Sequence, residues 1–374
     1  MKPISLSGKD NNFDFIRFIA ALLVIVNHSY FLLPVVEDPL LTFTSDRYNI
    51  GKIAVAVFFI ISGILITQSF QRTKSLFNYF TSRALRIYPA LIFVIFITVF
   101  LLGPLLTTYS LQEYFAATQT HKYLLFNITM VKAEYFLPGV FENNFRQGFV
   151  NGSLWTLPNE LACYVAVAII GMFRSRKMRA GMVLLVLFLG VFHYKFLNEQ
   201  KDAFFLHVLY FASGALAYSL RNRIVLNKYA ALIAFVVLVT NILFNKLLLA
   251  SAFITAFAMT YVILYLAFAN TSKFKNFTKH GDFSYGLYIW GWPVQQVVCM
   301  KVPNLTVFSF FLISTGITFV FAFISWHFIE KKALVLKKYI YSRNAADKTL
   351  YTLLQRNLTM LRLKEVLMKP ETRA

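Results

Sequence analysis

The stretch FDFIRFIAALLVIVNHSYFLLP (residues 13–34) decides how the rest of the chain is interpreted. It has the length and apolar composition of a membrane-spanning helix, yet Arg17 and His28 interrupt it. They are eleven residues apart, so in a helix they lie about 16 Å apart along the axis and are turned only about 20° from each other. Ionisable groups on one face of an apolar helix are costly in lipid and usually face a bundle interior or a polar cavity. The stretch therefore predicts a transmembrane helix that carries functional side chains.

The composition of the whole chain agrees with this interpretation. Of its 374 residues, 58% are hydrophobic and only 14% are charged, and the mean hydropathy is +0.61. A soluble protein would carry about 25% charged residues. The net charge of +21 would suit nucleic acid, but the charges follow the pattern of a membrane topology instead. We therefore expect no nucleic-acid partner. The two cysteines lie in apolar runs and form neither a disulfide framework nor a metal-ligand spacing, so we also expect no metal.

Apolar runs of about 20 residues recur along the chain and predict an all-α polytopic membrane protein with about ten transmembrane helices in one bundle. Residues 1–330 form the transmembrane domain, and residues 331–374 form a basic cytoplasmic tail. The predicted spans are 13–33, 53–70, 87–106, 153–172, 180–197, 203–220, 229–245, 247–269, 283–300 and 305–328.

The orientation follows from the positions of Lys and Arg. With the N-terminus in the cytoplasm, the cytoplasmic segments hold 27 of the 37 basic residues, and the bias remains 16 to 9 when the tail is left out. Basic residues are enriched on the cytoplasmic side of membrane proteins. Both termini are therefore predicted to be cytoplasmic.

Five motifs, in order along the chain, resemble the membrane-bound acyltransferase 3 family. The resemblance runs from about residue 11 to residue 332. In the fourth motif Thr156 stands where the family has Ser, and one extra residue precedes Glu160. The motifs are DFIRFIAALLVIVNH (14–28), FFIISGILIT (58–67), SRALRIYPAL (82–91), SLWTLPNE (153–160) and FSYGLYIWGWPV (283–294).

The resemblance implies an integral-membrane O-acyltransferase of the plasma membrane, here the bacterial inner membrane. Family members move acyl groups, usually acetyl from acetyl-CoA, onto hydroxyls of envelope carbohydrates or other small acceptors. We therefore expect acyl-CoA, most simply acetyl-CoA, as the cytoplasmic donor. The expected acceptor is a hydroxyl of a cell-envelope polysaccharide or its lipid-linked precursor, approached from the outer side.

His28 and Glu160 are the predicted catalytic residues. An imidazole titrates near neutrality, so His28 could take the proton of an attacking hydroxyl or carry the acyl group covalently. A carboxylate within a span is costly, so Glu160 should face the cavity, where it could orient His28 or bind an acceptor hydroxyl. A satisfied buried histidine and a structural partner for a buried cation are the alternatives.

Four residues are predicted to bind the donor. Arg17 could hold the CoA pyrophosphate, because a guanidinium forms paired hydrogen bonds to phosphate, although Asp14 one turn earlier could pair with it instead. Arg83 and Arg86 share one face of a helical turn at the cytoplasmic end of a span, where arginines are also expected from topology alone. Ser62 could line the acyl-CoA channel. Its neighbour Gly63 is predicted to serve helix packing.

A secondary transporter or flippase is the alternative function. Such a protein would use the same intramembrane charges to bind and move a small molecule or glycolipid. Transporters of this kind often contain internal repeats, and none is evident in the sequence. Flux without acyl-CoA would favour the transporter.

Overall fold

The described helices form one bundle in the computed structural model, which describes residues 11–340 with gaps at 35, 74, 173–202, 245–247, 269–273, 275–276, 280 and 338. Within these limits the chain is all helical, and its only extended pairing is an isolated bridge between Phe136 and Phe149. The predicted span at 180–197 and most of the predicted tail lie outside the described residues.

Long helices coincide with the nine other predicted spans. They are α1 (Phe13–Leu32), α3 (Ile50–Arg72), α4 (Leu76–Ile97), α8 (Leu157–Met172), α10 (Ala203–Ser219), α11 (Lys228–Phe244), α12 (Leu248–Phe268), α13 (Ser284–Lys301) and α14 (Val307–Ser325). Shorter elements connect or extend them: α2 (Pro39–Phe43), η1 (Thr98–Leu102), α5 (Gly103–Leu106), α6 (Leu111–Ala116), α7 (Thr118–Thr129), η2 (Gly152–Thr156), η3 (Phe277–Lys279) and η4 (Trp326–Glu330).

Two helices extend well beyond their predicted limits. The helix that contains α4 begins at Leu76 and continues through the π-helical η1 and α5 to Leu106, whereas the span was predicted to begin at residue 87. Its first turns carry polar residues such as Asn78 and Arg83, which lowers their hydropathy without breaking the helix. The last helix continues past its predicted end at residue 328, through the π-helical η4, to Lys337.

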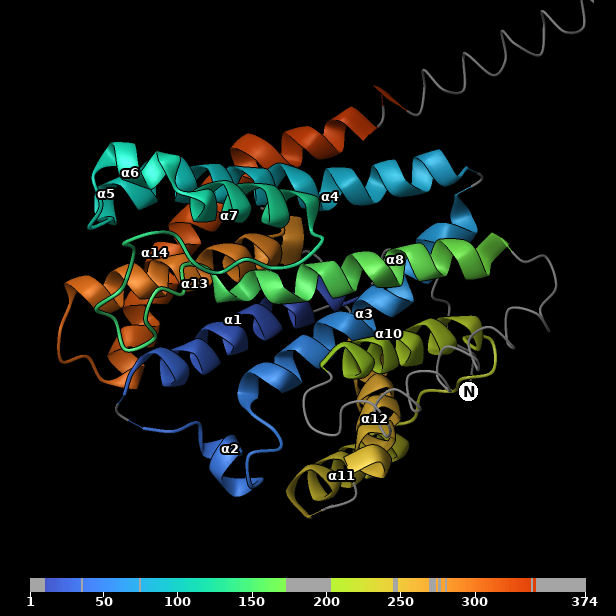
Figure 1. Ribbon diagram of the computed structural model, residues 1–374. Coiled ribbons are helices and arrows are strands. Elements are labelled where there is room, and N and C mark those ends of the chain that lie inside the picture. The colour runs from blue at the N-terminus through green and yellow to red at the C-terminus, as the bar shows by residue number, and fades with distance from the viewer. Residues whose placement is uncertain are drawn as a thin grey trace, which may run out of the picture.

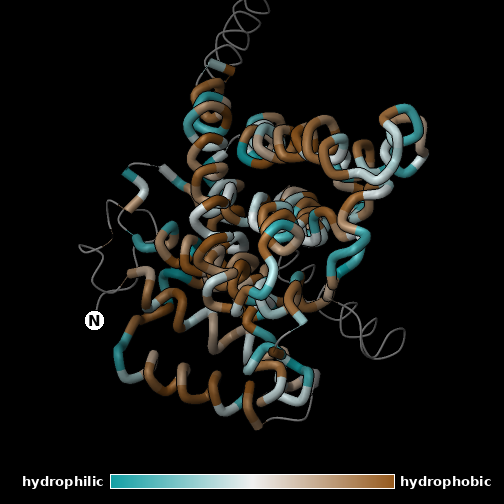
Figure 2. Tube along the Cα trace, turned by 90° about the vertical axis from the view of Figure 1, so that its left-hand side faces the viewer, coloured by the Kyte–Doolittle hydropathy of each residue, from teal (hydrophilic) through white to brown (hydrophobic). Residues whose placement is uncertain are grey.

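Six helices in the described part of the chain are long and apolar enough to cross a membrane, fewer than the ten spans predicted. Helices α10 and α11 have only 17 residues each, and the polar pair Gln295 and Gln296 lowers the hydropathy of α13. Large apolar side chains on the outside of the bundle are exposed, for example Phe308 at 70% and Ile233 at 65%. Hydrophobic residues make up most of the helices, and hydrophilic residues are frequent at the connections between them (Figure 2). This distribution is typical of helices that contact lipid.

The centre of the bundle is built on α3, which packs against α10 on one side and α1 on the other (Figure 1). The crossing of α3 and α10 is very close, because a Cβ atom on Gly63 would lie 2.0 Å from the Phe211 carbonyl oxygen and one on Gly214 would lie 2.1 Å from the Ile60 oxygen. Small residues allow helices to approach in this way. The predicted packing role of Gly63 is confirmed.

Helix α13 lies between α1 and α14 and anchors the long segment that follows α7. Asn151 donates to the Ile289 carbonyl oxygen at 3.0 Å, and Gln296 donates to the Phe149 oxygen at 2.7 Å. Trp292 Nε1 donates to the same Phe149 oxygen at 3.0 Å. The segment before η2 is thereby fixed to the middle of α13, beside the end of α1.

Candidate active site

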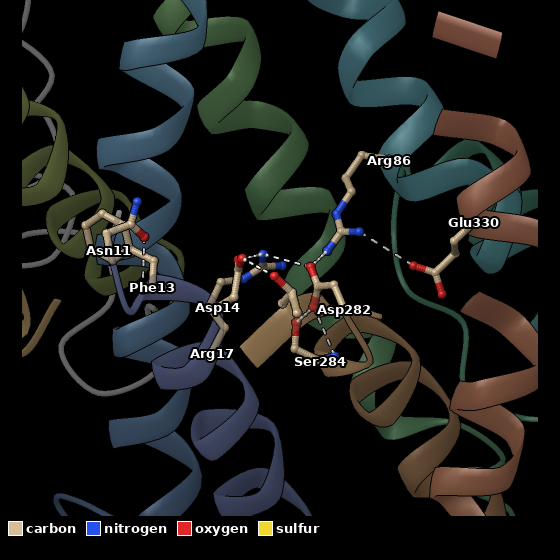
Figure 3. Close-up of polar contacts among 9 residues, drawn as sticks. Asn11, Phe13, Asp14, Arg17, Arg86, Asp282, Ser284 and Glu330 are labelled. Carbon is tan, nitrogen blue, oxygen red and sulfur yellow. Dashed lines mark hydrogen bonds and ion pairs between the residues drawn. The ribbon is translucent and has the colours of Figure 1, made fainter. Parts of the chain in front are cut away.

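Asp282, two residues before the start of α13, joins three helices. Its Oδ1 accepts hydrogen bonds from the Ser284 amide at 3.2 Å and the Ser284 hydroxyl at 2.6 Å, which orients the carboxylate at the start of α13. Its Oδ2 accepts from Arg17 Nη1 of α1 at 3.4 Å and from Arg86 Nη2 of α4 (Figure 3). Burial opposes ionisation of Asp282, but Arg86 and Arg17 outweigh it and hold the pKa of the carboxyl well below its usual range.

Two further acids complete this ion network. Glu330 of η4 is buried, accepts from the Ser325 hydroxyl at 3.0 Å and lies 3.7 Å from Arg86 Nη1. Asp14 lies 3.7 Å from Arg17 Nη1, so the alternative pairing considered for Arg17 does occur, but Asp282 shares the same guanidinium nitrogen. The network therefore links α1, α4, α14 and the start of α13.

A cavity of about 110 Å³ borders this network between α3, α4, α8 and α13. Its walls are mostly apolar and aromatic, with a few polar groups. Five of the six predicted site residues line it, namely Arg17, Ser62, Arg83, Arg86 and Glu160. These residues come from four helices and are separated by up to 143 positions in the chain, so only the fold brings them together.

Glu160 lies on the α8 side of the cavity with both of its hydrogen-bond donors close by. Its Oε1 accepts from the Ser62 hydroxyl at 3.1 Å and also from the Tyr164 hydroxyl one turn along α8. Tyr288 of α13 faces the same space and shares a 2.6 Å hydrogen bond with Thr156. The carboxylate thus contacts hydroxyl groups, and none of its hydrogen bonds within the described residues involves His28.

His28 lies apart from this cavity, nearer the end of α1, and is 8% exposed. Its ring meets Trp292 edge-to-face, with the centroids 4.7 Å apart and the planes at 76°. Gln295, beside the imidazole, donates to the Ile25 carbonyl oxygen and the Ser29 hydroxyl, each at 3.0 Å. His28 and Gln295 lie close enough for their side chains to interact, although within the described residues neither His28 Nδ1 nor Gln295 Oε1 has a partner at good hydrogen-bond geometry. Unpaired buried polar atoms are rare and indicate room for a polar ligand or water.

A concave surface of about 700 Å³ lies on the segment between α5 and η2. Phe136 in its wall packs on Phe149 with centroids 4.8 Å apart, and Phe149 in turn lies 6.2 Å from Trp292. A continuous series of rings therefore connects this surface to His28. Aromatic and polar side chains line it, including the exposed Tyr109, Glu142 and Gln147 and the half-buried Gln119.

Sequence reasoning missed Asp282, Glu330 and Gln295. Asp282 and Glu330 each adjoin a predicted span, and a lone acid at the edge of an apolar run in a chain rich in arginine is a signal that could have identified them. Gln295 interrupts an apolar run and carries the same signal. The partners of the two acids could not be found this way, because Asp282 and Glu330 each contact Arg86, which lies more than 190 residues earlier in the chain.

Comparison with known proteins gives one family and two relatives. A family model described as an acyltransferase domain matches residues 10–327. An O-acetyl transferase from Shigella phage Sf6 is 31% identical over 340 residues, which cover 87% of this chain and 96% of the relative. Nodulation protein 10 from Rhizobium leguminosarum bv. viciae is 29% identical over 365 residues, which cover 90% of this chain and 96% of that protein. No solved structure matches the chain.

Proposed function

The chain belongs to the acyltransferase 3 family and transfers acyl groups other than aminoacyl groups, and from this premise we propose that it is an integral-membrane O-acyltransferase that uses acyl-CoA. The acyl group is most simply acetyl, as the name of the phage relative suggests. The acceptor is a hydroxyl of a cell-envelope polysaccharide or its lipid-linked precursor.

The observation that carries this proposal is the grouping of Arg17, Arg83 and Arg86 around one cavity that also holds Ser62 and Glu160. Three guanidinium groups inside an apolar bundle are costly unless they meet acids or an anionic ligand. The phosphates of CoA are such a ligand, and the apolar and aromatic walls suit the pantetheine arm.

The proposed orientation places the arginine end of the cavity toward the cytoplasm, where acyl-CoA is found. The excess of Lys and Arg in alternate connecting segments supports this orientation, with both termini in the cytoplasm and the chain in the bacterial inner membrane. The ten-span topology is part of the same proposal.

His28 is proposed to act at the acyl end of the donor. It lies about 16 Å along α1 from Arg17, a distance comparable to an extended pantetheine arm. The acceptor oxygen attacks the thioester carbonyl while His28 takes the hydroxyl proton; the carbon–sulfur bond then breaks, and the CoA sulfur leaves with the proton from His28. Capture of the acyl group by His28 itself, followed by transfer, is the covalent version of this step.

The acceptor is proposed to approach along the concave surface between α5 and η2. Exposed rings beside amide and carboxylate groups suit a sugar, because the rings cover its apolar face and the polar groups meet its hydroxyls. The contacts from Phe136 through Phe149 and Trp292 to His28 support approach from this side.

The test compares ester-linked acyl groups on the surface glycans of wild-type and His28→Ala cells by mass spectrometry. We expect loss of the ester in the His28→Ala strain and its retention in a matched His207→Ala strain. His207 is also buried, but it stacks on Phe59 at 4.2 Å and bonds to Asn159 at 2.9 Å. Equal ester content in wild type and the folded His28→Ala variant would rule out this function, and substrate flux without acyl-CoA would favour a transporter.

A further inference from the structure

Gln295 of α13 is fixed beside His28 by two hydrogen bonds to α1. It is fully buried, and its Nε2 donates to the Ile25 carbonyl oxygen and to the Ser29 hydroxyl, each at 3.0 Å. The Ser29 hydroxyl gives its own hydrogen to the Ile25 oxygen at 2.9 Å, so it can only accept from Gln295. Both N–H groups of the amide are thereby used. The amide cannot be turned over without losing both bonds, so Gln295 Oε1 is an acceptor with a fixed direction.

Helices α13 and α1 approach each other closely at this point. A Cβ atom on Gly291, one turn before Gln295, would lie 3.2 Å from the Ile25 side chain. The ring of His28 meets Trp292 edge-to-face, and the side chains of His28 and Gln295 lie close enough to interact. The imidazole therefore lies against α13 and contacts this helix at two residues.

Two buried atoms have no other partner within the described residues where these side chains meet, Gln295 Oε1 and His28 Nδ1. An amide oxygen can only accept a hydrogen bond. A lone pair on Nδ1 would place two buried acceptors beside each other and leave both unsatisfied, which is costly. A proton on Nδ1 satisfies both atoms at once. A neutral imidazole carries one proton, so the lone pair then resides on His28 Nε2.

The second ring nitrogen of His28 has different surroundings. Within the described residues His28 Nε2 makes no hydrogen bond, and it is not enclosed as Nδ1 is. Glu160, which the sequence suggested could orient His28, instead accepts from Ser62 and Tyr164. The orienting contact to His28 therefore comes from α13, on the side of the ring opposite to its open nitrogen.

From this arrangement we propose that Gln295 is a positioning residue for acyl transfer, whose amide oxygen accepts the Nδ1 proton of His28 and keeps the lone pair on Nε2. The inference rests on the proposed function, since it takes His28 as the base. Nε2 takes the proton of the attacking hydroxyl and later passes it to the CoA sulfur as the carbon–sulfur bond breaks. The bond from Nδ1 to Gln295 is kept throughout, so the ring keeps its direction.

The first part of the experiment is nitrogen NMR at neutral pH on the full chain in lipid nanodiscs, with isotope-labelled histidine. It reports which ring nitrogen carries the proton, and the signals of His28 are those missing from His28→Ala. Wild-type His28 should carry its proton on Nδ1. Gln295→Met keeps the length of the side chain without an acceptor oxygen, so the proton should move toward Nε2. The Ile25 oxygen still accepts from Ser29 in this variant, which limits the structural loss.

The second part measures acetyl transfer from acetyl-CoA by the same proteins. Gln295→Met should lower kcat about tenfold or more, because the lone pair is then on the wrong nitrogen in much of the protein, and should leave the KM for acetyl-CoA nearly unchanged. Gln295→Glu keeps an acceptor oxygen in either protonation state. It should therefore hold the proton on Nδ1 and recover part of the lost kcat.

Gln296→Met is the matched control for loss of a buried amide. Gln296 is the next residue of α13 and equally buried, but its hydrogen bonds go to Asn144, Arg146 and Phe149. The substitution should lower the Tm and leave the proton of His28 on Nδ1. A change of tautomer equal to that in Gln295→Met would overturn the assignment of Gln295.

The assignment is also overturned if wild-type His28 carries its proton on Nε2, a result that stands even if Gln295→Met does not fold. It is overturned as well if folded Gln295→Met keeps both the wild-type tautomer and the wild-type kcat. The NMR signals need no substrate. Wild-type protein with the proton on Nδ1 and no transfer from acetyl-CoA would therefore overturn the proposed function, while the contact between Gln295 and His28 would hold.

Discussion

Arg17 and Arg86 lie on different helices and meet at a single atom, Oδ2 of Asp282 (Figure 3). Arg86 is 69 positions after Arg17 in the sequence, and Asp282 is 196 positions after Arg86. The carboxylate therefore acts as a fixed point for α1, α4 and α13, and both arginine side chains remain partly buried, with 20% and 18% of their surface exposed.

Asp282→Asn should destabilise the protein strongly. The substitution keeps the size of the side chain but removes the charge that offsets two buried cations, and breaking such a pair typically costs about 3–5 kcal/mol. Thermal unfolding in detergent should show a clearly lower Tm. Asp46→Asn is a suitable control, because Asp46 is exposed and its φ of 64° is well tolerated by Asn. Equal Tm values for the two variants would contradict the role given to Asp282.

The close crossing of α3 and α10 makes a second prediction. Gly63→Ala places a Cβ atom 2.0 Å from the Phe211 backbone oxygen, so the two helices must separate. Overpacking typically costs about 1–3 kcal/mol, and here the obstacle is backbone, which cannot change rotamer. The expected result is a lower yield of monodisperse protein and a lower Tm.

Gly316→Ala is the control for this crossing. Gly316 lies within α14, and a Cβ atom there would meet nothing within 4 Å. Replacing a helical glycine by alanine stabilises by about 0.5–1 kcal/mol where space allows. The two Gly→Ala variants should therefore shift Tm in opposite directions, and a shift of the same sign would show that the crossing is looser than described.

The first helix was predictable from its residues, but the position of its two polar groups was not. Helical geometry correctly puts Arg17 and His28 on α1, and hydropathy alone gives its limits to within a residue. The sequence of this helix could not show that Arg17 borders a cavity with Ser62 and Glu160, whereas His28 packs against Trp292. The neighbouring helices α3, α8 and α13 decide which part of the polar face of α1 borders the cavity.

The start of α4 was predicted eleven residues too late for a related reason. A hydropathy window reports apolar content, whereas backbone hydrogen bonds continue through the polar turns that carry Arg83 and Arg86. These turns are polar because they face the ion network and the cavity. The role of Asp282 could not be predicted from the sequence, because it depends on contacts with Arg17 and Arg86 that only the folded chain brings about.

Glu160→Gln should reduce acyl transfer while the protein stays folded. The amide keeps the shape of the side chain, but it removes the negative charge that accepts hydrogen bonds from Ser62 and Tyr164 in the cavity. Loss of one such electrostatic contact in a site lowers the turnover rate by about 10²–10³-fold when it acts in the transition state. Steady-state acetyl transfer from acetyl-CoA measures this effect.

Tyr164→Phe distinguishes a role in the reaction from a role in packing. It removes one donor to Glu160 but leaves the carboxylate in place, so we expect a smaller loss of turnover than for Glu160→Gln. If Glu160→Gln transfers acetyl groups at the wild-type rate, Glu160 has no part in the reaction, whatever the result for Tyr164→Phe.

Trp292→Phe should separate donor binding from acyl transfer. The indole places its ring 4.7 Å from the His28 ring, and its Nε1 fixes it to the Phe149 oxygen; the phenyl ring is smaller and lacks that donor. His28 would then lose its fixed orientation, although the cavity around Arg83 contains neither residue. The turnover of acetyl-CoA should fall about tenfold or more, because a small misplacement of a reacting group is costly, while the binding constant for acetyl-CoA stays the same.

Trp290→Phe is the matched control. The Trp290 Nε1 has no hydrogen-bond partner within the described residues, so this substitution should change turnover little. If both Trp→Phe variants lose turnover equally, Trp292 has no special role in orienting His28, and the loss reflects packing within α13.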